Sequence, residues 1–449
     1  MADFNTDVIL AQIQAALERE DLTSAIHILE ALRPADQAEV FEELDDEDKV
    51  SLLPSLNPSI SADILENLDE DHAAQLVASI SRESAVRIID EMEPDEAADL
   101  LGDVSSERAK SFLAGLENPE EVRPLLIHAD ESAGGLMTSD FLALRRRMTA
   151  LEAIEAIRQW KPEDETIYYL FVVDGERRLT GVVSLRQLIV AEPGALVADI
   201  MDPEVISVPA GTDQEEVARI ISHYDLLALP VVDAEERVVG VITVDDVIDV
   251  MVEEATEDFQ RLGGAQPLEH SYLRSRIFSV TGKRIGWLLL LFLTESLTGT
   301  VLRHFETEIQ TVVALAFFVP LLIGTGGNAG SQTTSTIIRA LALGDIDLGD
   351  ALRALWHEFR VGIALGLGMA VVAYLRALTW GSSTGLALTV SVAILTIVVW
   401  ANVLGAILPL LAGRLRIDPT VVSGPVMSTL VDATGLFIYF TIARIVLNL

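Results

Sequence analysis

Charge and apolarity are divided between two parts of this chain, and the division limits the folds it can adopt. Of the 449 residues, 1–272 contain 60 acids and 19 bases, a net charge of −41. Residues 273–449 contain 9 acids and 12 bases, a net charge of +3, although half of the whole chain is apolar. An acidic, water-soluble part followed by a membrane part accounts for both facts. We therefore expect several domains, of which only the last spans a membrane.

Composition also excludes several function classes. Phosphate binding needs a basic footprint, so no nucleic-acid partner is expected. The chain has no cysteine, which excludes disulfides, thiolate metal sites and cysteine nucleophiles. No basic and apolar leader precedes the first domain, which we place in the cytoplasm. Phosphate-loop, dinucleotide-binding, zinc-protease and nucleophile-elbow patterns are missing from the sequence, so we expect a protein that is not an enzyme.

A twelve-residue repeat organises residues 1–130, the first predicted domain. Apolar residues recur at this spacing, namely Leu32, Leu44, Leu56, Leu68, Ile80, Met92, Val104 and Leu116. The residues that follow six of them are Asp45, Asn57, Asp69, Ser81, Glu93 and Ser105, and five of these six are good helix N-caps. Pro58 and Pro94 then occupy the first helical position, where a missing N–H group costs nothing. The pattern predicts a superhelix of short stacked helices.

An internal duplication follows in residues 131–249. The segments 169–174 and 229–233 are matching apolar strands, and the segments 181–184 and 240–243 share a Gly-x-x-Ser/Thr pattern. Helices are expected at 150–160 and 214–223. Two αβ units in this order are typical of a tandem CBS module. Thr243 and Asp246 fit the usual ribose contact of such a module, whereas the first copy has Ser184 and Gln187 at these places.

Residues 250–276 form a predicted linking helix, which overlaps a charged helical pattern at 247–275. Five apolar segments in the pore domain, 277–449, are long enough to cross about 30 Å of hydrocarbon. They are predicted near 277–302, 311–343, 359–380, 384–412 and 421–447. Nine flanking arginines and lysines fall on one side and three on the other. The positive-inside rule then places the N-terminus in the cytoplasm and the C-terminus outside.

Polar groups inside the predicted spans are the first candidates for chemistry. Asp432 lies in the middle of the last span, where a lone carboxylate is costly unless it faces water or a cation. The second span contains the small and polar run 324–334, which would suit a pore wall or, alternatively, close helix packing. Asn402 and Gly405 are weaker signals in the fourth span. Glu295 is equivocal, and the pair His357-Glu358 is expected at the membrane interface.

Clustered acids are the second constellation. Asp95 and Asp99 share one helical face, where like charges destabilise a helix unless they are neutralised. A single carboxylate is more often a solvated surface group. The net charge of the whole part nevertheless favours divalent counterions, and oxygen ligands with few histidines suit Mg²⁺ or Ca²⁺.

The order of these parts resembles the MgtE family of magnesium channels, over essentially the whole chain. The most specific segments are 320–330, 255–258 and 430–435. The resemblance implies a multi-domain fold: an α-helical superhelical N domain, a tandem CBS α+β module, a linking helix and a five-helix transmembrane domain. It also implies a homodimer in the plasma (inner) membrane, with a pore that closes when cytosolic Mg²⁺ is abundant.

The same resemblance assigns site residues. The pore and inner mouth receive Asp432 and Asp418. Regulatory metal sites receive Asp63, Asp95, Asp99, Gly135, Asp213, Glu215, Ser222, Asp225, Asp246, Asp249, Glu254, Glu257 and Asp258. An ATP pocket receives Tyr169 and Arg186. Gly424 departs from the family pattern, since an asparagine is expected at that pore position.

The predicted function is Mg²⁺ import through a channel that cytosolic Mg²⁺ closes, as part of Mg²⁺ homeostasis. Mg²⁺ is then both cargo and regulatory ligand, with ATP as a modulator. The alternatives are a coupled divalent-cation exchanger or exporter, and a nucleotide-sensing membrane receptor. The polar run 324–334 speaks against a receptor whose spans serve only as an anchor.

Overall fold

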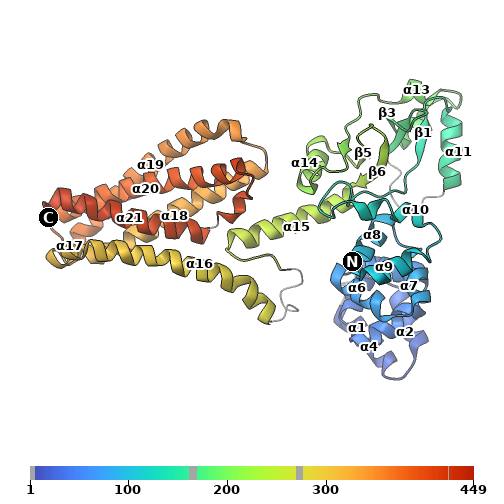
Figure 1. The fold of residues 1–449 in the computed structure, drawn as a ribbon, viewed down its shortest axis with the longest axis horizontal. Helices are drawn as coiled ribbons and strands as arrows, with labels where there is room; N and C mark the ends of the chain where they lie inside the picture. The colour runs from blue at the N-terminus through green and yellow to red at the C-terminus, as the bar shows by residue number, and fades with distance from the viewer. Residues whose placement is uncertain (1–5, 161–168, 269–276, 423) are drawn as a thin grey trace. The chain divides into compact units, whose positions relative to one another are not determined.

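A computed structural model describes residues 6–160, 169–268, 277–422 and 424–449. The chain forms two compact units, residues 1–251 and 252–449 (Figure 1). Each unit is described by itself below, because their relative placement is not determined. The predicted succession of a helical N domain, a CBS pair and five long apolar helices is confirmed.

The N domain consists of short helices that begin where the repeat predicts. Helices α3 to α9 start directly after Arg33, Asp45, Asn57, Asp69, Ser81, Glu93 and Ser105. Their bounds, with the flanking helices, are α1 Thr6–Leu17, α2 Leu22–Glu30, α3 Pro34–Glu42, α4 Asp46–Leu52, α5 Pro58–Glu66, α6 Glu70–Ser79, α7 Arg82–Ile89, α8 Pro94–Asp103, α9 Ser106–Leu113 and α10 Pro119–Val122, with 3-10 turns η1 Leu53–Ser55 and η2 Leu125–Ile127. Of the six predicted caps, the side chains of Asn57 and Ser81 accept a hydrogen bond from the first turn.

Each helix of the repeat packs on the helix two places further along. Helix α3 contacts α5, α5 contacts α7 and α7 contacts α9, while α4 contacts α6 and α6 contacts α8. The helices thus form two interleaved rows with a shared apolar core. The twelve-residue positions from Leu44 to Leu116 point into this core and are buried, except for the half-buried Ile80. A single unit could not bury its apolar face alone, as expected for stacked repeats.

The CBS pair consists of two three-stranded sheets of identical topology. The elements are β1 Ala143–Arg145, α11 Ala150–Trp160, β2 Tyr169–Val173, β3 Leu179–Ser184, α12 Leu185–Val190 and α13 Val197–Ile200, then β4 Val208–Pro209, α14 Gln214–Tyr224, β5 Ala228–Val232 and β6 Val238–Thr243. In each sheet the first strand pairs parallel to the second, and the second pairs antiparallel to the third. Both antiparallel pairs shift register at the last pair of residues. The duplication seen in the sequence is therefore a structural duplication.

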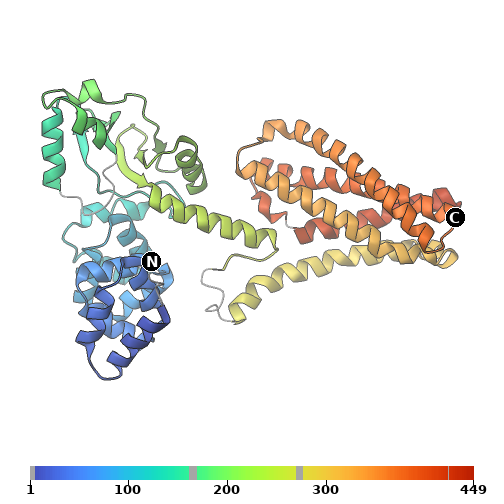
Figure 2. The same cartoon turned by 180° about the vertical axis from the view of Figure 1, so that it is seen from behind.

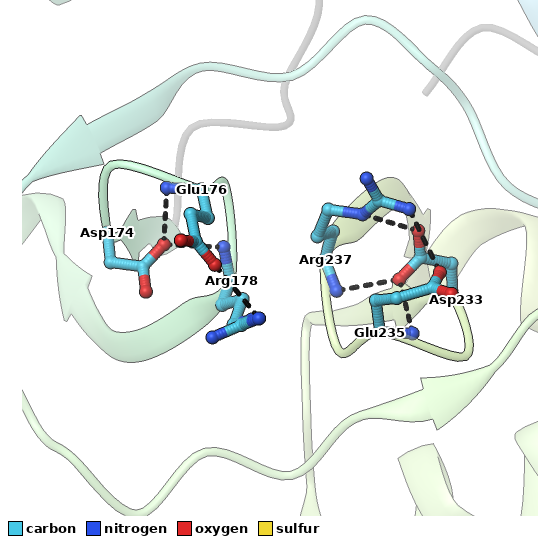
Figure 3. A network of polar contacts seen from close by, with 6 residues as sticks. All are labelled: Asp174, Glu176, Arg178, Asp233, Glu235 and Arg237. Atoms are coloured by element: carbon cyan, nitrogen blue, oxygen red, sulfur yellow. Dashed lines mark hydrogen bonds and ion pairs between the residues drawn. The ribbon is translucent and has the colours of Figure 1, made fainter.

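The hairpin turns of the two sheets have matching polar networks (Figure 3), and backbone hydrogen bonds join the two turns. In each turn an aspartate, Asp174 or Asp233, accepts two backbone N–H bonds at 2.8–3.0 Å, which lower the pKa of its carboxyl. The fourth residue of each turn has a left-handed backbone, at φ 65° for Arg177 and 63° for Glu236. The N–H of Leu179 donates to the carbonyl of Glu236 and that of Val238 to the carbonyl of Arg177, both at 3.1 Å. These reciprocal bonds relate the two copies by an approximate two-fold arrangement.

The N domain shares its core with the second CBS sheet. Apolar residues of β4, β5, β6 and α14 belong to the same buried cluster as the N-domain helices, whereas the first sheet has a separate core with α11. Met137, from the segment between the N domain and the first CBS strand, is 1% exposed and also packs in the shared cluster. This packing places helix α8 beside the start of the helix after β6.

That helix, α15 (Val244–Leu262), corrects the predicted linking helix. The pattern predicted a helix through 275, but the helix ends at Leu262 and residues 263–268 are not helical. Gly263 and Gly264 stop it, the latter with a φ of 75° that favours glycine. Pro267 follows, and a proline cannot continue a helix. Residues 269–276 of the prediction lie outside the described residues.

The membrane unit contains the five predicted long apolar helices (Figures 1 and 2). They are α16 Ile277–His304, α18 Ala314–Ala342, α19 Ala351–Thr379, α20 Thr384–Arg414 and α21 Gly424–Leu447, with α17 Glu306–Thr311 and the 3-10 turns η3 Leu348–Asp350 and η4 Pro419–Val421 between them. Helix α20 is central and contacts α18, α19 and α21, whereas α16 packs mainly along α21. Helix α19 begins eight residues earlier than the predicted third span, a difference that matters for Glu358.

Candidate ion site and regulatory acids

Asp432 lies on α21 in a cavity of about 350 Å³ between α18 and α21. The lining comes from both helices and consists of Pro320, Ile323, Gly324, Gly327, Asn328, Ser428 and Asp432. Asp432 is half-buried, while Gly324 and Asn328 are exposed in the single chain. Exposed polar groups in the middle of a membrane helix are not compatible with a lipid neighbour. The cavity is thus a polar site within the membrane segment.

The run 324–334 has both roles that the sequence left open, because some of its residues line the cavity and others allow close helix packing. Gly326 and Gly330 are buried, and a Cβ atom on either would lie 2.6 Å from Ile397 or Met427, so these two glycines permit close packing. Gly324 and Asn328 instead line the cavity. Gly327 does both, since it faces Ser428 and a Cβ there would lie 3.1 Å from the serine hydroxyl. Helix α18 therefore uses one face to pack and another to line the polar site.

Gly424 begins α21 and is bound through its backbone. The hydroxyl of Ser331 on α18 donates to the Gly424 carbonyl at 3.2 Å and lies 3.5 Å from the hydroxyl of Ser428. Glu295 is an exposed residue of α16 and is near enough to Asp432 for the two charges to repel. The cavity is therefore acidic, and Asp432 is the carboxylate among its lining residues.

The carboxylate of Asp418 is paired with the guanidinium of Arg261. Its carboxylate accepts from the backbone N–H and hydroxyl of Thr420, at 2.8 and 2.6 Å, and from the Arg261 guanidinium at 2.6 Å. Arg261 also pairs with Glu257 one turn earlier on α15. Burial, and then the charge of Asp418, raises the pKa of Asp258 to about 6. Arg261 thus neutralises acids from two segments, Glu257 at the end of α15 and Asp418 in the loop before α21.

The pair His357-Glu358 is expected at the membrane interface from the sequence. In the structure His357 is exposed, but Glu358 is only 9% exposed, because α19 begins at Ala351 and carries this residue into the bundle. Asn402 on α20, 1% exposed, lies beside it. Neither residue lines the cavity of Asp432.

In the first unit, four acids come together where α8 meets the start of α15. This cytosolic acid cluster consists of Asp95, Glu96, Asp99 and Asp246. Asp95 is 6% exposed, and one of its carboxylate oxygens has no hydrogen-bond partner among the described residues. Asp246 accepts from the hydroxyl of Thr243 at 2.6 Å. Glu66 and Glu70 on neighbouring helices add further negative charge.

Burial and mutual repulsion raise the pKa of every member of the cytosolic acid cluster. Burial and then the charge of Asp246 raise the pKa of Asp95 to about 7. Burial and then Asp95 raise that of Glu96 to about 9. Burial and then Glu70 raise that of Asp99 to about 8, and burial raises that of Asp246 to about 6. At neutral pH Glu96 and Asp99 therefore favour a bound proton or cation over free charge.

Within the described residues, no three acids or histidines converge as a ready-made metal site. The acids are near one another but not arranged around one point. A cation would therefore bind here by drawing the carboxylates together, which suits a site that changes conformation on binding.

The other predicted regulatory residues lie apart from this cluster. Asp63 is half-buried on α5, and Gly135 is buried in the turn after the N domain, where a Cβ would lie 2.4 Å from the Asp130 carbonyl. Asp213 caps the start of α14 through the N–H of Glu215. Asp225 ends α14 with a φ of 51°, and Ser222 is exposed in its last turn. Asp213 and Glu215 lie at the start of α14, and Ser222 and Asp225 lie at its end. These four residues therefore do not form one site within the described part of the chain.

The remaining acids lie along α15. Asp249 is exposed, while Glu254, Glu257 and Asp258 are half-buried. They occupy successive turns of the helix.

The predicted nucleotide residues do share a cavity. A pocket of about 670 Å³ in the first CBS copy is lined by Tyr169 and Arg186 together with Ser184, Gln187 and Leu227 among others. Ser184 and Gln187 are engaged in a capping box at the start of α12. In the second copy, Thr243 and Asp246 bond to each other, and the space beside Thr243 holds only about 20 Å³ between Phe141, Trp160 and Tyr169. The described residues thus give a nucleotide room beside Tyr169 and Arg186.

Comparisons with known proteins agree with this arrangement. A family profile described as a divalent cation transporter, MgtE, matches residues 319–442. The MgtE intracellular N domain matches 32–130, and two CBS domains match 133–194 and 197–253. The magnesium transporter MgtE of Thermus thermophilus is 46% identical over 73% of this chain and 73% of its own length. The chain belongs to the MgtE family.

Other MgtE proteins support the assignment. The magnesium transporter MgtE of Enterococcus faecalis is 36% identical over 73% of this chain and 72% of its own length. A crystal structure described as the cytosolic domain of the Mg²⁺ channel MgtE in complex with ATP is 39% identical, with a TM-score of 0.51. It covers 54% of this chain and 99% of that chain. As expected of an MgtE protein, the chain is a membrane protein with five helices long and apolar enough to span a bilayer.

Sequence reasoning missed two features of this MgtE chain. Glu96 belongs to the cytosolic acid cluster, and its place directly after Asp95 in an acidic first turn was the available signal. Glu358 was assigned to the interface because the third span was predicted to begin after it. A helical pattern extended back to Ala351 would have placed it inside the bundle.

Proposed function

We propose that this chain is a Mg²⁺ channel of the plasma membrane that imports Mg²⁺ and is closed by cytosolic Mg²⁺. It acts as a homodimer and a transporter, not as an enzyme. Its N-terminus lies in the cytoplasm and its C-terminus outside, in accord with the flanking positive charges. Its MgtE relatives, described as magnesium transporters, support the choice of ion.

The observation that carries the proposal is the position of Asp432. Its carboxylate lies in a cavity of about 350 Å³, beside the exposed Asn328 and Gly324. Mg²⁺ gives up its water reluctantly, so a pore that conducts it should bind the hydrated ion through charge and hydrogen bonds. A second copy of the chain would supply a second Asp432 and enclose the cavity. Two carboxylates around one axis would match a divalent hydrate.

The cytosolic acid cluster supports regulation by the same ion. Free charge is unfavourable there at neutral pH, since burial and repulsion raise every pKa in the cluster. A divalent cation relieves that repulsion, and it favours whichever conformation holds the acids closest. Moving a gate from 1:99 to 99:1 takes about 5.5 kcal/mol of differential binding, which several weak sites can share.

ATP is the proposed modulator, held in the pocket of Tyr169 and Arg186. Its cavity of about 670 Å³ supports this assignment, as does the ATP named for the related cytosolic domain.

A flux assay tests the proposal directly. Liposomes that contain the purified protein should take up Mg²⁺ down its own gradient, without Na⁺ and without a proton gradient. Patch recordings should then show closure as Mg²⁺ on the cytosolic face rises from micromolar to millimolar. Uptake that requires a counter-gradient would instead identify a coupled exchanger.

A further inference from the structure

A buried carboxylate lies in the membrane unit outside the Asp432 cavity. Glu358 on α19 is 9% exposed. The hydroxyl of Thr333 on α18 lies 3.3 Å from its Oε2 atom, and the Nδ2 atom of Asn402 on α20 lies 3.4 Å from the same oxygen. Three helices thus direct polar side chains to one point. Since Thr333 is six residues beyond Gly327, this point lies about 9 Å further along α18 than the ion site.

The negative charge at this point lacks a cation. None of the ion pairs found among the described residues includes Glu358; Arg353 pairs with Asp350, and Arg444 with Glu308. Hydrogen bonds to a carboxylate from charged donors are about 2.7–2.9 Å long, and the two contacts here are neutral and longer. A carboxylate this deep in a membrane protein is costly unless a cation neutralises it.

Asn402 provides an independent observation. It is 1% exposed, and its Oδ1 atom has no hydrogen-bond partner within the described part of the chain. A buried, unpaired amide oxygen destabilises the folded protein. A half-turn of the amide exchanges Oδ1 with Nδ2, and it would place Oδ1 at the position 3.4 Å from Glu358. The orphaned oxygen is then aimed at the same point as the uncompensated charge.

The packing around this point excludes a hydrated ion. A Cβ atom on Gly362 would lie 3.2 Å from the Cβ of Asn402, and a Cβ on Gly405 would lie 2.7 Å from the carbonyl of Gly330. The backbones of three helices are therefore in close contact beside Glu358. Any cation here must be bare and coordinated by protein oxygens.

We propose that Glu358, Asn402 and Thr333 bind a dehydrated Na⁺ ion between α18, α19 and α20. Ligands at right angles around an ion are separated by about 1.4 times the bond length. The Thr333 hydroxyl oxygen and Glu358 Oε2, 3.3 Å apart, therefore match bonds of about 2.3 Å, in the range of about 2.3–2.6 Å known for Ca²⁺, an ion of similar size to Na⁺. Mg²⁺, with bonds of about 2.0–2.1 Å, would need oxygens about 2.9 Å apart.

Charge decides between Na⁺ and Ca²⁺. The site has one carboxylate, and the other two ligands are neutral. One negative charge neutralises a monovalent ion, whereas a bare divalent ion would leave a net positive charge between the helices. The bound Na⁺ fixes α18, which carries the lining of the Asp432 cavity, against α19 and α20. This role is separate from permeation.

Binding of radioactive Na⁺ to the purified full-length protein in detergent tests the proposal, with Mg²⁺ held constant. The wild type should bind about one Na⁺ per chain, displaced by unlabelled Na⁺ but not by equal K⁺ or Ca²⁺. Glu358→Gln should lower the affinity by at least about 10-fold, about 1.4 kcal/mol. Thermal unfolding of the wild type, followed by its tryptophans, should shift upward by about 2–4 °C when Na⁺ replaces an organic cation, a shift that Glu358→Gln should lose.

Matched variants separate this site from general effects on folding. Thr333→Val removes a proposed ligand and should weaken Na⁺ binding. Thr389→Val removes an equally buried hydroxyl of α20 that bonds only within its own helix, and it should bind Na⁺ like the wild type. Asp432→Asn should also retain Na⁺ binding. Loss of binding in Asp432→Asn would place the ion in the pore cavity and overturn the proposal.

Two further results would refute it. Equal stability in Na⁺, K⁺ and an organic cation would show that the point binds no Na⁺. Stability that follows pH alone, and changes with Glu358→Gln but not with Na⁺, would show that a proton neutralises Glu358.

Discussion

The two units of the chain handle carboxylates in opposite ways. In the membrane unit, Asp432 stands as the lone carboxylate of an open polar cavity, with Glu295 as the acid whose charge acts on it. In the first unit, Asp95 is buried, Glu96 and Asp99 are half-buried beside it, and the charge of Asp95 acts on both. A site that an ion must leave quickly suits a single accessible charge. A site that must respond to an ion suits crowded charges whose repulsion is relieved on binding. The difference thus separates conduction from sensing.

The largest expected effect is at Asp432. Asp432→Asn keeps size and hydrogen bonding but removes the charge, so Mg²⁺ uptake into liposomes should fall on the order of 100-fold or more. Asp432→Glu should retain part of the activity. Asp350→Asn, which removes an acid that pairs with Arg353 outside the cavity, is the matched control and should conduct normally. Normal uptake by Asp432→Asn would place selectivity elsewhere, and Glu295 would be tested next.

Neutralising the sensing acids should leave conduction intact. The triple variant Asp95→Asn, Asp99→Asn, Asp246→Asn should need at least about 10-fold more cytosolic Mg²⁺ to close in patch recordings, because its acids no longer bind the ion preferentially in one state. The control neutralises Asp45, Asp46 and Glu47, exposed acids at the start of α4, and changes the net charge equally. If both triple variants respond alike, total charge and not the cluster sets closure.

The raised pKa values predict a pH dependence of stability without Mg²⁺. A carboxyl whose folded pKa lies above its unfolded value contributes stability below the unfolded value of about 4, and the contribution is lost as pH rises through the folded pKa. The folded pKa values in the cluster, from about 6 for Asp246 to about 9 for Glu96, set the pH window. The first thermal transition of the full-length protein should therefore fall between pH 5 and pH 9.

Glu96→Gln sharpens this test. It removes a buried, repelled charge, so at pH 9 its first transition should lie about 2–4 °C above that of the wild type. At pH 5, where Glu96 is protonated, the two proteins should unfold at similar temperatures. Millimolar Mg²⁺ should raise the wild-type transition at pH 9 more than that of Glu96→Gln. A wild-type transition that does not move with pH would contradict the crowded cluster.

The smallest expected effect is at Arg261, whose guanidinium pairs with both Asp418 and Glu257. Arg261→Gln frees Asp418 and Glu257 from their base, so Mg²⁺ should bind these acids more readily. Both sides of the pair with Asp418 are about one-third exposed, which limits the gain to about 0.2–1 kcal/mol. Closure should then occur at about 2- to 5-fold lower Mg²⁺. A shift to higher Mg²⁺ would show that the arginine assists closure.

Local signals in the sequence were sufficient for the repeat and the duplication. Helix starts such as Asn57 and Glu93 were placed correctly because a cap, a proline and an apolar spacing coincide there. Asp432 was identified because a lone charge in an apolar span has few structural explanations. The end of α15 was missed, although Gly263 and Gly264 were visible, because the charged helical pattern continues past them.

Contacts between distant segments could not be read from the sequence. Asp95 and Asp246 come together because α8 and the second CBS sheet share one apolar core, which no local pattern encodes. Glu358 and Asn402 likewise meet through the packing of α19 on α20. The ion pair of Arg261 with Asp418 joins residues 157 positions apart. In each case burial and partner, which decide the chemistry, are tertiary properties.

The two interleaved rows of the N domain have a consequence for insertions and deletions. Neighbouring helices of the repeat belong to different rows, and each packs on the helix two places away. The sequence repeats every twelve residues, but a helix returns to the same row only after twenty-four. Loss of one unit would keep every helix start in phase and yet move all following helices to the opposite row, carrying α8 and its acids away from α15. Length changes compatible with this architecture therefore come in pairs of units.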